Sequence, residues 1–416
     1  MTYIEFFDED VIENICGCLV SVPDRVILIG DNKKRLENHA ERYHSFFLDR
    51  GYDIEFEFRT VNKNSLSSIV DMLSDIVEEY DDCVFDLTGG QELMLVAVGI
   101  IYYHYRDMDI QMHRLNLRSN MLYDCDNDGN NISVDSLPQV SVEELIRLYG
   151  GKVVYESDKP GATIRWKWSE EFMDDIDTIW DICRRDVRAW NTQIGVFSAA
   201  EELNDGGNPL VTTVSMPKIS EYLNSFSAKY VEINRIIEEL QENGLMTFDD
   251  SEEDIVTITY KNEQVKRCLT KAGQALEMKV TLSAMRAMDK SEDYIYNDVM
   301  NGAYIDWDGD IHTEQEGCDT ENEIDVLMMH GIIPVFVSCK NGIIDMDELY
   351  KLNAVATKFG GKYAKKVLIA TALGKDNPFA EHFRQRAKDM NIRLVENIQK
   401  TKDDDLERII GSLWCN

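Results

Sequence analysis

Short apolar runs alternate with longer amphipathic segments along residues 1–140. The apolar runs predict strands at residues 25–30, 54–58 and 83–87, and helical periodicity predicts helices at residues 33–50, 65–80 and 93–105. Residues 110–135 read as a closing hairpin, with a turn at residues 126–131. Repeated β-α-β crossovers of this length predict a parallel α/β sheet that binds ligands at the carboxyl ends of its strands.

The middle of the chain has the pattern of a winged helix-turn-helix. Residues 218–224 and 229–243 predict two helices, the second ending at Gly244, and residues 245–248 and 255–260 predict a β-wing. A further helix is expected from Gly273 to Met285. The second helix carries more Glu than Lys or Arg, which disfavours binding of duplex DNA. We therefore interpret this region as a structural spacer or a dimerising module.

Residues 290–416 predict a last unit of alternating elements. We expect helices at residues 291–299, 345–359 and 377–390, and strands at 306–311, 366–371 and 392–395, around a central pair of strands at residues 324–329 and 332–337. The resulting α-β-β-β-α-β order is that of a compact nuclease core.

The central pair reads as a hairpin turning at His330 and Gly331. Because side chains alternate along a strand, Glu323 and Asp325 share one face of the first run, and Ser338 and Lys340 share one face of the second. Pairing as a hairpin brings Asp325 close to Ser338 and Lys340 at the open end. Two acids and a lysine then project together from an apolar sheet.

Such a cluster suits metal-dependent phosphodiester hydrolysis. Two carboxylates can hold one or two divalent cations, which activate water, and a neighbouring lysine can stabilise the charge that develops on the phosphate. The alternative is a buried hairpin whose polar ends simply face water. The hairpin pattern alone favours neither.

A second candidate site follows the strand predicted at residues 83–87. Thr88-Gly-Gly-Gln-Glu92 precedes an apolar helix, so its glycines and the helix N-terminus could cradle a nucleotide phosphate. The alternative is a sharp turn that needs glycine for its geometry alone. The segment is neither a Walker loop nor a G-x-G-x-x-G motif.

Length, charge and cysteine spacing limit the number of domains and the classes of function. The chain of 416 residues is long enough for two or three domains, and its net charge of −34 disfavours non-specific coating of duplex nucleic acid. Residues 1–150 hold 12 Lys/Arg and 29 Asp/Glu, whereas residues 341–400 hold 11 and 7. The nine cysteines lack zinc-site spacing, and no run reaches transmembrane length. We expect free thiols, a cytoplasmic protein and no membrane association.

Two motifs together resemble a known family. Phe85-Asp-Leu-Thr-Gly-Gly-Gln-Glu-Leu-Met94 resembles the signature of CRISPR-associated Rossmann-fold (CARF) sensor domains. The hairpin from Glu323 to Lys340, followed by Phe359-Gly-Gly-Lys-Tyr-Ala, resembles the PD-(D/E)xK domain at the C-terminus of one CARF family. That family consists of nucleases switched on by cyclic tetra-adenylate in type III CRISPR immunity.

The resemblance implies an α/β protein of three parts. Residues 1–145 would form a Rossmann-like CARF sensor, residues 146–285 a helical and winged-helix-like connecting region, and residues 286–416 a restriction-endonuclease-like PD-(D/E)xK domain. It also implies a homodimer with one cyclic ligand on the two-fold axis. The ligand would contact two sets of residues, Gly30, Asp31 and Asn32 in the first loop and Thr88, Gly89, Gly90 and Gln91 in the second. Because residues 1–150 are so acidic, the phosphates must be attracted locally, by backbone N–H groups and Arg118.

For the nuclease, the resemblance assigns metal binding to Asp325, assisted by Glu323, and charge stabilisation to Lys340. The metal would be Mn²⁺ or Mg²⁺. The family usually has an acid two residues before the lysine, and Ser338 stands there instead. Glu323, the Cys339 carbonyl and Glu292, on the preceding predicted helix, are the candidate replacements.

The leading hypothesis is thus an endonuclease gated by a cyclic oligoadenylate, which cuts single-stranded DNA or RNA or nicks supercoiled DNA. One alternative is a non-catalytic regulator that responds to the ligand and binds DNA. Another is a resolvase or repair nuclease without a ligand, which would leave the sensor-like part unexplained.

Overall fold

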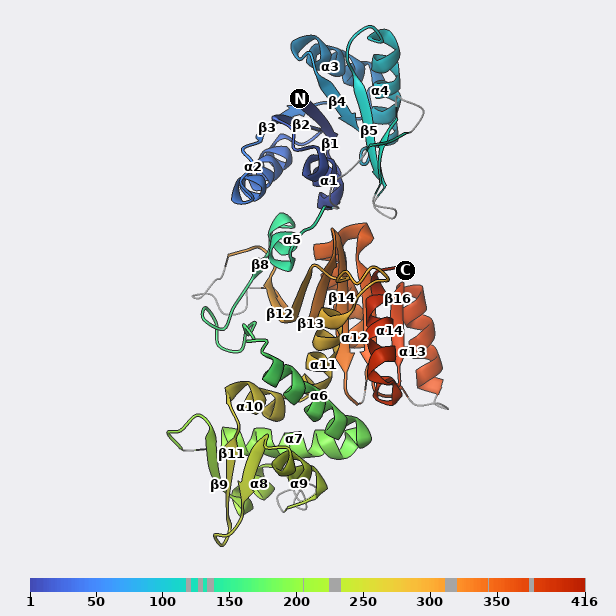
Figure 1. Cartoon of the computed structure of the whole chain (residues 1–416). Helices are drawn as coiled ribbons and strands as arrows, with labels where there is room; N and C mark the ends of the chain where they lie inside the picture. Colours follow the sequence, from blue (N-terminus) through green and yellow to red (C-terminus); the bar gives the residue numbers. More distant parts are fainter. Residues whose placement is uncertain are drawn as a thin grey trace. The chain divides into compact units, whose positions relative to one another are not determined.

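The computed structural model of the chain describes residues 1–116, 121–125, 130–132, 138–204, 206–223, 233–310, 320–342, 344–373 and 378–415. The chain divides into two compact units, and Figure 1 labels their elements. Unit 1 comprises Met1–Gly151 and the hexapeptide Lys358–Tyr363; unit 2 comprises Lys152–Thr357 and Ala364–Asn416.

Unit 1 is built on a seven-stranded sheet in the order β3-β2-β1-β4-β5-β6-β7. The first five strands are parallel, and β6 and β7 are added antiparallel. The strands are β1 (Thr2–Phe6), β2 (Arg25–Gly30), β3 (Glu55–Thr60), β4 (Cys83–Asp86), β5 (Gln111–Asn116), β6 (Met121–Asp124) and β7 (Asn130–Ile132); the helices are α1 (Val11–Ser21), α2 (Lys33–Asp49), α3 (Leu66–Glu79), α4 (Glu92–His104) and α5 (Val142–Leu148). The predicted parallel α/β sheet is confirmed.

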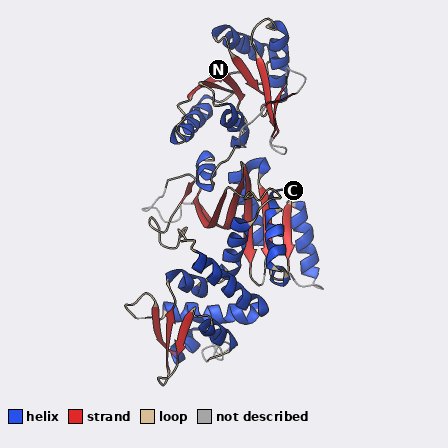
Figure 2. Ribbon diagram, in the orientation of Figure 1, coloured by secondary structure: helices blue, strands red, loops and turns tan. Residues whose placement is uncertain are grey.

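Two elements of unit 1 were not predicted, and they lie at its centre. Strand β1 is buried along its whole length between β2 and β4, and helix α1 follows it directly. Helices α3 and α4 pack on one face of the sheet, where Ile4, Ile27 and Phe85 belong to the same buried cluster. The alternation of helices and strands is visible in Figure 2.

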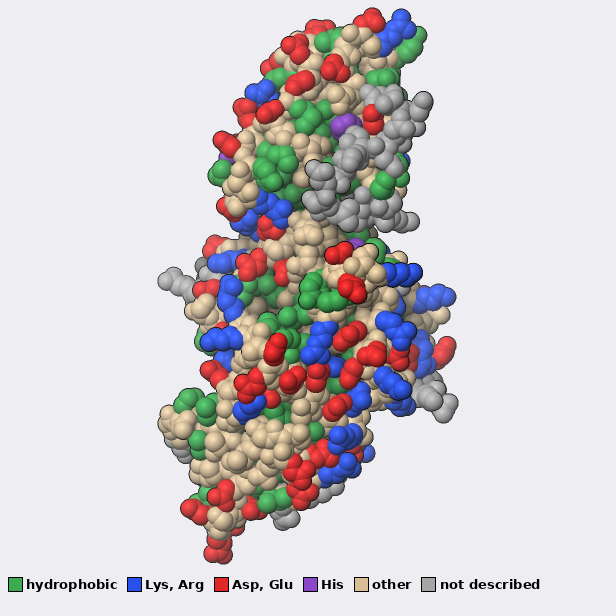
Figure 3. Space-filling model, viewed as in Figure 1, with side chains coloured by type: hydrophobic (Ala, Val, Ile, Leu, Met, Phe, Trp, Pro, Cys, Tyr) green, Lys and Arg blue, Asp and Glu red, His purple; other side chains and the backbone are tan. Residues whose placement is uncertain are grey.

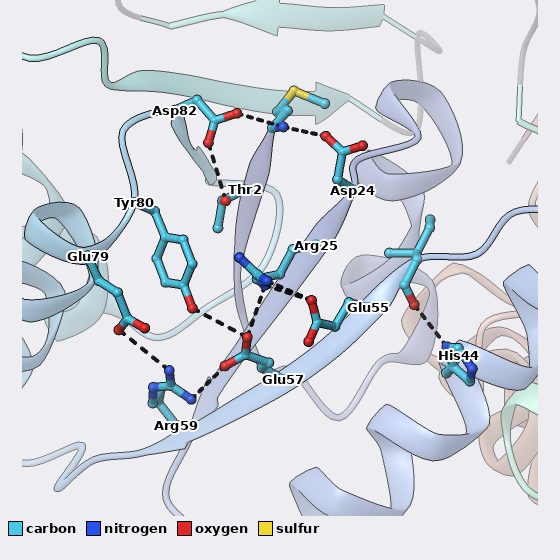
Figure 4. A network of polar contacts seen from close by, with 12 residues as sticks. Thr2, Asp24, Arg25, His44, Glu55, Glu57, Arg59, Glu79, Tyr80 and Asp82 are labelled. Carbon is cyan, nitrogen blue, oxygen red and sulfur yellow. Dashed lines mark hydrogen bonds and ion pairs between the residues drawn. The ribbon is translucent and has the colours of Figure 1, made fainter.

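Charged side chains line the β3 edge of the sheet (Figure 4). Arg25 bridges to Glu55 at 2.7 Å and to Glu57 at 3.0 Å, and Arg59 pairs with Glu57 at 2.9 Å. Exposed pairs contribute little stability, but charges along an edge strand oppose its pairing with another chain. This network runs along β3 from Glu55 at its amino end to Arg59 near its carboxyl end.

Unit 2 contains a six-stranded sheet in the order β16-β15-β14-β13-β12-β8. Strands β8, β12, β13 and β14 pair antiparallel with their neighbours, and β14, β15 and β16 pair parallel. The bounds are β8 (Lys152–Val153), β12 (Asp298–Asp306), β13 (Glu321–His330), β14 (Ile333–Lys340), β15 (Lys365–Ala370) and β16 (Ile392–Glu396). The predicted hairpin is confirmed, with Leu327 opposite Phe336 and a turn at Gly331 with φ of 62°.

The helix predicted at residues 291–299 is wrong. Glu292 has a positive φ of 65°, Met288 and Tyr294 form a β-bridge, and strand β12 begins at Asp298. The helix that packs across β12, β13 and β14 is instead α11 (Gln274–Arg286). It had been expected as the end of the connecting region.

The remaining elements of unit 2 include a three-stranded sheet in the order β10-β11-β9. The predicted wing is confirmed as β10 and β11, with β9 as an unpredicted third strand. The helix predicted from residue 229 begins only at Arg235, because Asn234 caps it; Lys229 lies outside the described residues. These elements are α6 (Glu170–Arg185), α7 (Val187–Glu202), β9 (Val211–Ser215), α8 (Met216–Leu223), α9 (Arg235–Glu242), β10 (Met246–Asp249), β11 (Ile255–Tyr260) and α10 (Glu263–Thr270).

One hydrophobic core joins the helical region to the larger sheet of unit 2. Trp180 and Phe197 belong to the same buried cluster as Val326 and Val337. The chain then closes with α12 (Asp347–Gly360), α13 (Pro378–Asp389) and α14 (Asp403–Gly411). The eight cysteines of the described residues are free thiols, and none of the described helices is long and apolar enough to cross a membrane.

Candidate functional site

The strand order of unit 1 reverses between β1 and β4. In open α/β sheets, ligands bind outside the carboxyl ends of the strands at such a reversal. The loop after β4 holds Thr88, Gly89, Gly90 and Gln91, so the structure places the predicted cradle at this position. The loop after β1 faces it from the neighbouring strand.

The turn after β4 is held by hydrogen bonds that start from Asp86. The Thr88 N–H donates to Asp86 Oδ1 at 2.7 Å, and the Leu115 N–H donates to Thr88 Oγ1 at 2.9 Å. Asp86 is fully buried, and Leu115 belongs to the neighbouring strand β5. The conformation of the turn is therefore tied to two strands rather than left to the loop itself.

Gly90 is required by geometry. Its φ is +98°, and a Cβ there would lie 2.8 Å from Cβ of Phe6. Gly89 is less constrained, because a Cβ there meets nothing closer than 3.4 Å. The close approach to Phe6 explains why residue 90 is glycine, whether or not a ligand binds here. Gln91 occupies the N-cap of α4 without capping it through its side chain, so the helix start is not covered from within.

The residues after β2 are held by local interactions. Asn32 Oδ1 accepts the N–H of Arg35 and caps α2, and Asp31 pairs with Lys63 Nζ at 2.8 Å. A Cβ on Gly30 would lie 3.0 Å from Leu36 Cδ2. These three predicted ligand residues thus lie one strand away from the reversal, and Arg118 falls outside the described residues.

Buried carboxyls beneath the cradle were not predicted. Glu5 and Asp86 are both fully buried, and Glu5 Oε2 and Asp86 Oδ2 have no hydrogen-bond partner within the described structure. Burial raises the pKa of Asp86 to about 6 and raises the pKa of Glu5 well above its usual value. Burial thus favours the neutral form of both acids, most strongly for Glu5, which reduces the negative charge close to the Thr88 turn.

Helix α1 begins with two further buried acids, and both bind the hexapeptide of unit 1. Glu13 accepts hydrogen bonds from Lys362 Nζ and Tyr363 Oη, both at 2.5 Å. Asp10 accepts the N–H of Lys362 at 2.8 Å and the hydroxyl of Tyr149 at 2.8 Å. The segment directly after β1 is thus bonded to a part of the chain that follows α12.

The hairpin of unit 2 brings together three of the predicted catalytic residues. Asp325 Oδ2 accepts the Cys339 N–H at 2.6 Å and the Ser338 hydroxyl at 3.2 Å, and it lies 4.0 Å from Lys340 Nζ. Burial raises the pKa of Asp325, although Lys340 and the two donors oppose this effect. The predicted proximity of these residues is present in the structure.

Helix α12 adds a residue that the sequence did not indicate. Glu348, in the first turn of this helix, forms an ion pair with Lys340, with 2.7 Å between Oε2 and Nζ. Burial lowers the pKa of Lys340, but Asp325 and Glu348 raise it by more, so the net direction is upward. Lys340 therefore stays protonated between two carboxylates. An acid at the start of a helix is common for other reasons, so only the fold reveals this role.

Helix α11 adds Glu277, which is 6% exposed. Burial raises its pKa to about 8, with the charge of Asp325 as the next cause, and Glu277 Oε2 has no hydrogen-bond partner within the described residues. A buried acid beside another acid is unfavourable unless a cation joins them. The sequence did offer one signal for this residue, since Glu277 is the only acid in its predicted helix. That helix had, however, been assigned to the connecting region.

The other two acids proposed for the metal lie elsewhere. Glu323 forms an ion pair with Lys271 Nζ at 2.7 Å, and its side chain is 39% exposed. Glu292 lies in an exposed turn before β12, near the hairpin end of β13 rather than its open end. Within the described parts of the chain, no group of three or more His, Cys, Asp or Glu is placed to hold a metal ion. Of the predicted carboxylates, Asp325 alone is left at this position.

No protein-family model matches the sequence, and no curated protein matches it. Solved structures do match. The crystal structure of protein VC1899 from Vibrio cholerae aligns over 99% of this chain and 97% of its own, with a TM-score of 0.73 and 15% identity. Can2 from Sulfobacillus thermosulfidooxidans, in complex with cyclic tetra-adenylate, covers the same shares with a TM-score of 0.65 and 15% identity.

The chain shares the fold of these two proteins. A third structure, a type III CRISPR defence DNA nuclease activated by cyclic oligoadenylate, aligns over 91% of this chain and 47% of its own at 15% identity. Its TM-score is only 0.45, too low to show a shared fold. The alignment with Can2 and VC1899 spans both units, so the combination of units, and not only the sheet of unit 1, is common to them.

We expect Gly90→Ala to destabilise the protein by about 1–3 kcal/mol, because the added Cβ meets Phe6 and the backbone is left-handed. Gly99→Ala is the matched control on the following helix, where a Cβ meets nothing, and it should stabilise by about 0.5–1 kcal/mol. Chemical denaturation measures both. Equal stabilities of the two variants would contradict the strain assigned to Gly90.

The free energy of unfolding should fall as pH rises from about 4 to about 6, by an amount of the order of 1–3 kcal/mol from Asp86. The folded state binds the Asp86 proton more tightly than the unfolded state, so this contribution is present at low pH and lost as pH passes the folded pKa. Asp86→Asn should flatten that slope, whereas Asn at the exposed Asp81 should leave it unchanged. Parallel slopes for all three proteins, measured by urea titration, would contradict the shift.

Proposed function

We propose that the protein is a metal-dependent endonuclease activated by a cyclic oligoadenylate, and that it acts on single-stranded DNA or RNA or nicks supercoiled DNA. The observation that carries this proposal is the half-buried Asp325, 4.0 Å from Lys340 Nζ, together with the buried acid Glu277, whose charge interacts with that of Asp325. Such a group is costly to maintain in a purely structural hairpin. It is suited to phosphodiester chemistry.

The residues present fit one hard divalent cation. Asp325 and Glu277 supply carboxylate oxygens, and the unpartnered Glu277 Oε2 is available for a ligand bond. The Cys339 carbonyl and the Ser338 hydroxyl are the further oxygen donors nearby. Oxygen donors of this kind suit Mg²⁺ or Mn²⁺. When bound, the cation would supply an activated water and neutralise charge on the phosphate.

The protein side chains have distinct roles in this proposal. Lys340 holds a positive charge 4.0 Å from Asp325 Oδ2, where it can stabilise negative charge that develops on the phosphate. Glu348 positions Lys340 from the opposite side. The Ser338 hydroxyl and the Cys339 N–H hold the Asp325 carboxylate in one orientation. Ser338 thereby orients the acid instead of serving as a second one.

For the activator, we propose cyclic tetra-adenylate, bound between two copies of unit 1 in a homodimer. Can2, which shares the fold over almost the whole chain, is bound to this molecule. The crevice between β1 and β4 offers the start of α4, and backbone N–H groups at a helix start attract phosphate. The raised pKa of the buried Glu5 favours its neutral form, which limits the repulsion of an anion nearby.

Helix α12 is the part of the chain through which ligand binding could activate the nuclease. It starts in unit 2 and ends in unit 1, because Lys358–Tyr363 belongs to unit 1. Its first turn holds Glu348 on Lys340, and the residues after its end bind Glu13 next to the β1 loop. In this proposal, ligand binding at the β1 loop changes the position of α12 and thereby that of Lys340.

The second candidate function is a non-catalytic regulator that binds DNA through the winged region. Its recognition helix would be α9, which carries Glu238, Glu239 and Glu242 against one cation, Arg235, within its bounds. Glu239 also occupies the guanidinium groups of Arg185 and Arg235. These acids oppose contact with phosphates, so we favour the nuclease. A nuclease without a ligand would leave the crevice of unit 1 without a role.

We expect Asp325→Ala, Lys340→Ala and Glu277→Gln each to lower cleavage about 100-fold or more, because each removes a metal ligand or the charge on the phosphate. Cleavage of labelled single-stranded DNA, RNA and supercoiled plasmid would be followed with Mn²⁺ or Mg²⁺, with and without cyclic tetra-adenylate. Asp250→Ala and Lys290→Ala, which change exposed residues of unit 2, serve as controls. Normal cleavage by any of the three site variants would remove that residue from the site.

Gly90→Asp should abolish cyclic tetra-adenylate binding and activation, because it places charge and bulk where an anionic ring must approach. Gly99→Asp adds the same charge to the exposed side of α4 and should bind and activate normally. Calorimetric titration measures binding. If binding and cleavage are coupled, a saturating uncleavable substrate must tighten ligand binding by the same factor by which ligand tightens substrate binding. Unchanged affinity for the ligand would mean that the two sites are independent.

A further inference from the structure

Basic side chains gather at the β16 edge of the unit 2 sheet. One open hollow there is lined by Lys365, Lys366, Arg384, Lys388 and Arg393, with Glu396 as its single acid. A second is lined by Lys400, Lys402 and Arg408, with Asp405 as its acid. We call these eight cations the basic track. Figure 3 shows Lys and Arg side chains on the part of unit 2 that carries α13 and α14.

The two hollows adjoin each other through Arg393. This side chain lines the first hollow, and its guanidinium donates to the carbonyl of Ser412 at 2.9 Å and to its hydroxyl at 3.1 Å. Ser412 lines the second hollow, and the next residue, Leu413, lines the first. The cations therefore form one continuous strip along the edge of the sheet.

Several cations of the strip are held in place. Arg384 makes a bidentate pair with Glu396 at 2.7 and 2.8 Å, and Lys366 donates to Asn353 at 2.8 Å and to the carbonyl of Met390 at 2.6 Å. Lys388 and Lys402 are exposed, and no hydrogen bond or ion pair to a described residue holds either one. These two are available to an external anion.

The register of the sheet relates the track to the candidate nuclease site. Lys340 is level with Ala370 on β15 and, through it, with Glu396 at the end of β16, and Lys400 and Lys402 follow Glu396 in the chain. The cations of the first hollow lie farther away, because Lys366 is level with Phe336, four residues or about 13 Å along the strand from Lys340. The track then continues away along β16. A strand cut at Lys340 could follow this direction for several nucleotides.

We propose that the basic track binds the sugar-phosphate backbone of the substrate strand beyond the bond that is cut. This inference rests on the proposed function and adds how the acidic chain holds its substrate. A protein of net charge −34 repels nucleic acid, so a local strip of cations is needed for affinity. Neither hollow has an aromatic side chain in its lining, so the contact is with phosphates and not with stacked bases.

The test compares two double variants of the full-length protein. Lys388→Gln/Lys402→Gln removes the two available cations, and Lys218→Gln/Lys290→Gln removes two exposed lysines elsewhere in unit 2. Binding of a labelled single-stranded oligonucleotide would be measured on an Asp325→Ala background, across a salt series, with inorganic phosphate and polyglutamate as competitors. Cleavage would be measured separately with Asp325 intact.

The track variant should weaken oligonucleotide binding about tenfold at low salt and reduce the salt slope by about 1–1.5, since each lost phosphate contact on a single strand contributes about 0.7. In cleavage it should raise KM with little change in kcat, and cyclic tetra-adenylate binding should stay unchanged. The control variant should match the parent protein in all of these.

Equal binding and equal slopes for the two variants would overturn the track, even if ligand-activated cleavage is present. Displacement of the oligonucleotide by polyglutamate at equal charge concentration would also overturn it, in favour of an acidic protein partner. Binding that depends on the track without any cleavage would leave the track in place and remove the proposed function. Full displacement by millimolar phosphate would reduce the track to a free-anion site and contradict the proposal.

Discussion

The half-buried carboxylate of Asp325 is the constraint on which this hairpin of unit 2 depends. A charge in the interior must be matched by donors, and the hairpin supplies them from the facing strand as the Cys339 N–H and the Ser338 hydroxyl. A shift of one residue in the register would turn Ser338 and Lys340 to the opposite face. The register, the turn at Gly331 and the position of α12, which brings Glu348 to Lys340, all follow from satisfying this one charge and its lysine.

The sequence predicted those parts of the fold that depend on local periodicity. The hairpin could be predicted because a period of two sets both strand and face, and Asp325, Ser338 and Lys340 lie together as expected. Glu277 could not, because helical periodicity does not say which sheet a helix covers. The polar segment around Glu292 resembled a helix, but its pairing with β13 made it a turn and a strand. Tertiary pairing overrode local preference there.

In unit 1, the loops were predicted but not what lies beneath them. Thr88 to Gln91 could be placed because glycines after an apolar run mark a strand end. Strand β1 has five residues, too few for periodicity to distinguish, and it supplies Glu5 to the floor of the crevice. Glu5 and Asp86 are separated by about eighty positions in the sequence, and only the pairing of β1 with β4 makes them neighbours. A buried acid pair of this kind is set by topology.

The two units meet the same electrostatic difficulty in different ways. In the proposed function, each would bind a polyanion in a chain with 77 acids and 43 Lys and Arg. Unit 1 favours the protonated form of Glu5 and Asp86 by burying them, and it presents backbone dipoles at a helix start. Unit 2 places Lys340 between Asp325 and Glu348 and gathers further Lys and Arg side chains along one sheet edge. For the proposed cyclic ligand, burial would suit an enclosed ring, because desolvation strengthens backbone hydrogen bonds. A long strand stays partly in solvent, where only full charges attract it, and attract it in a way that added salt weakens.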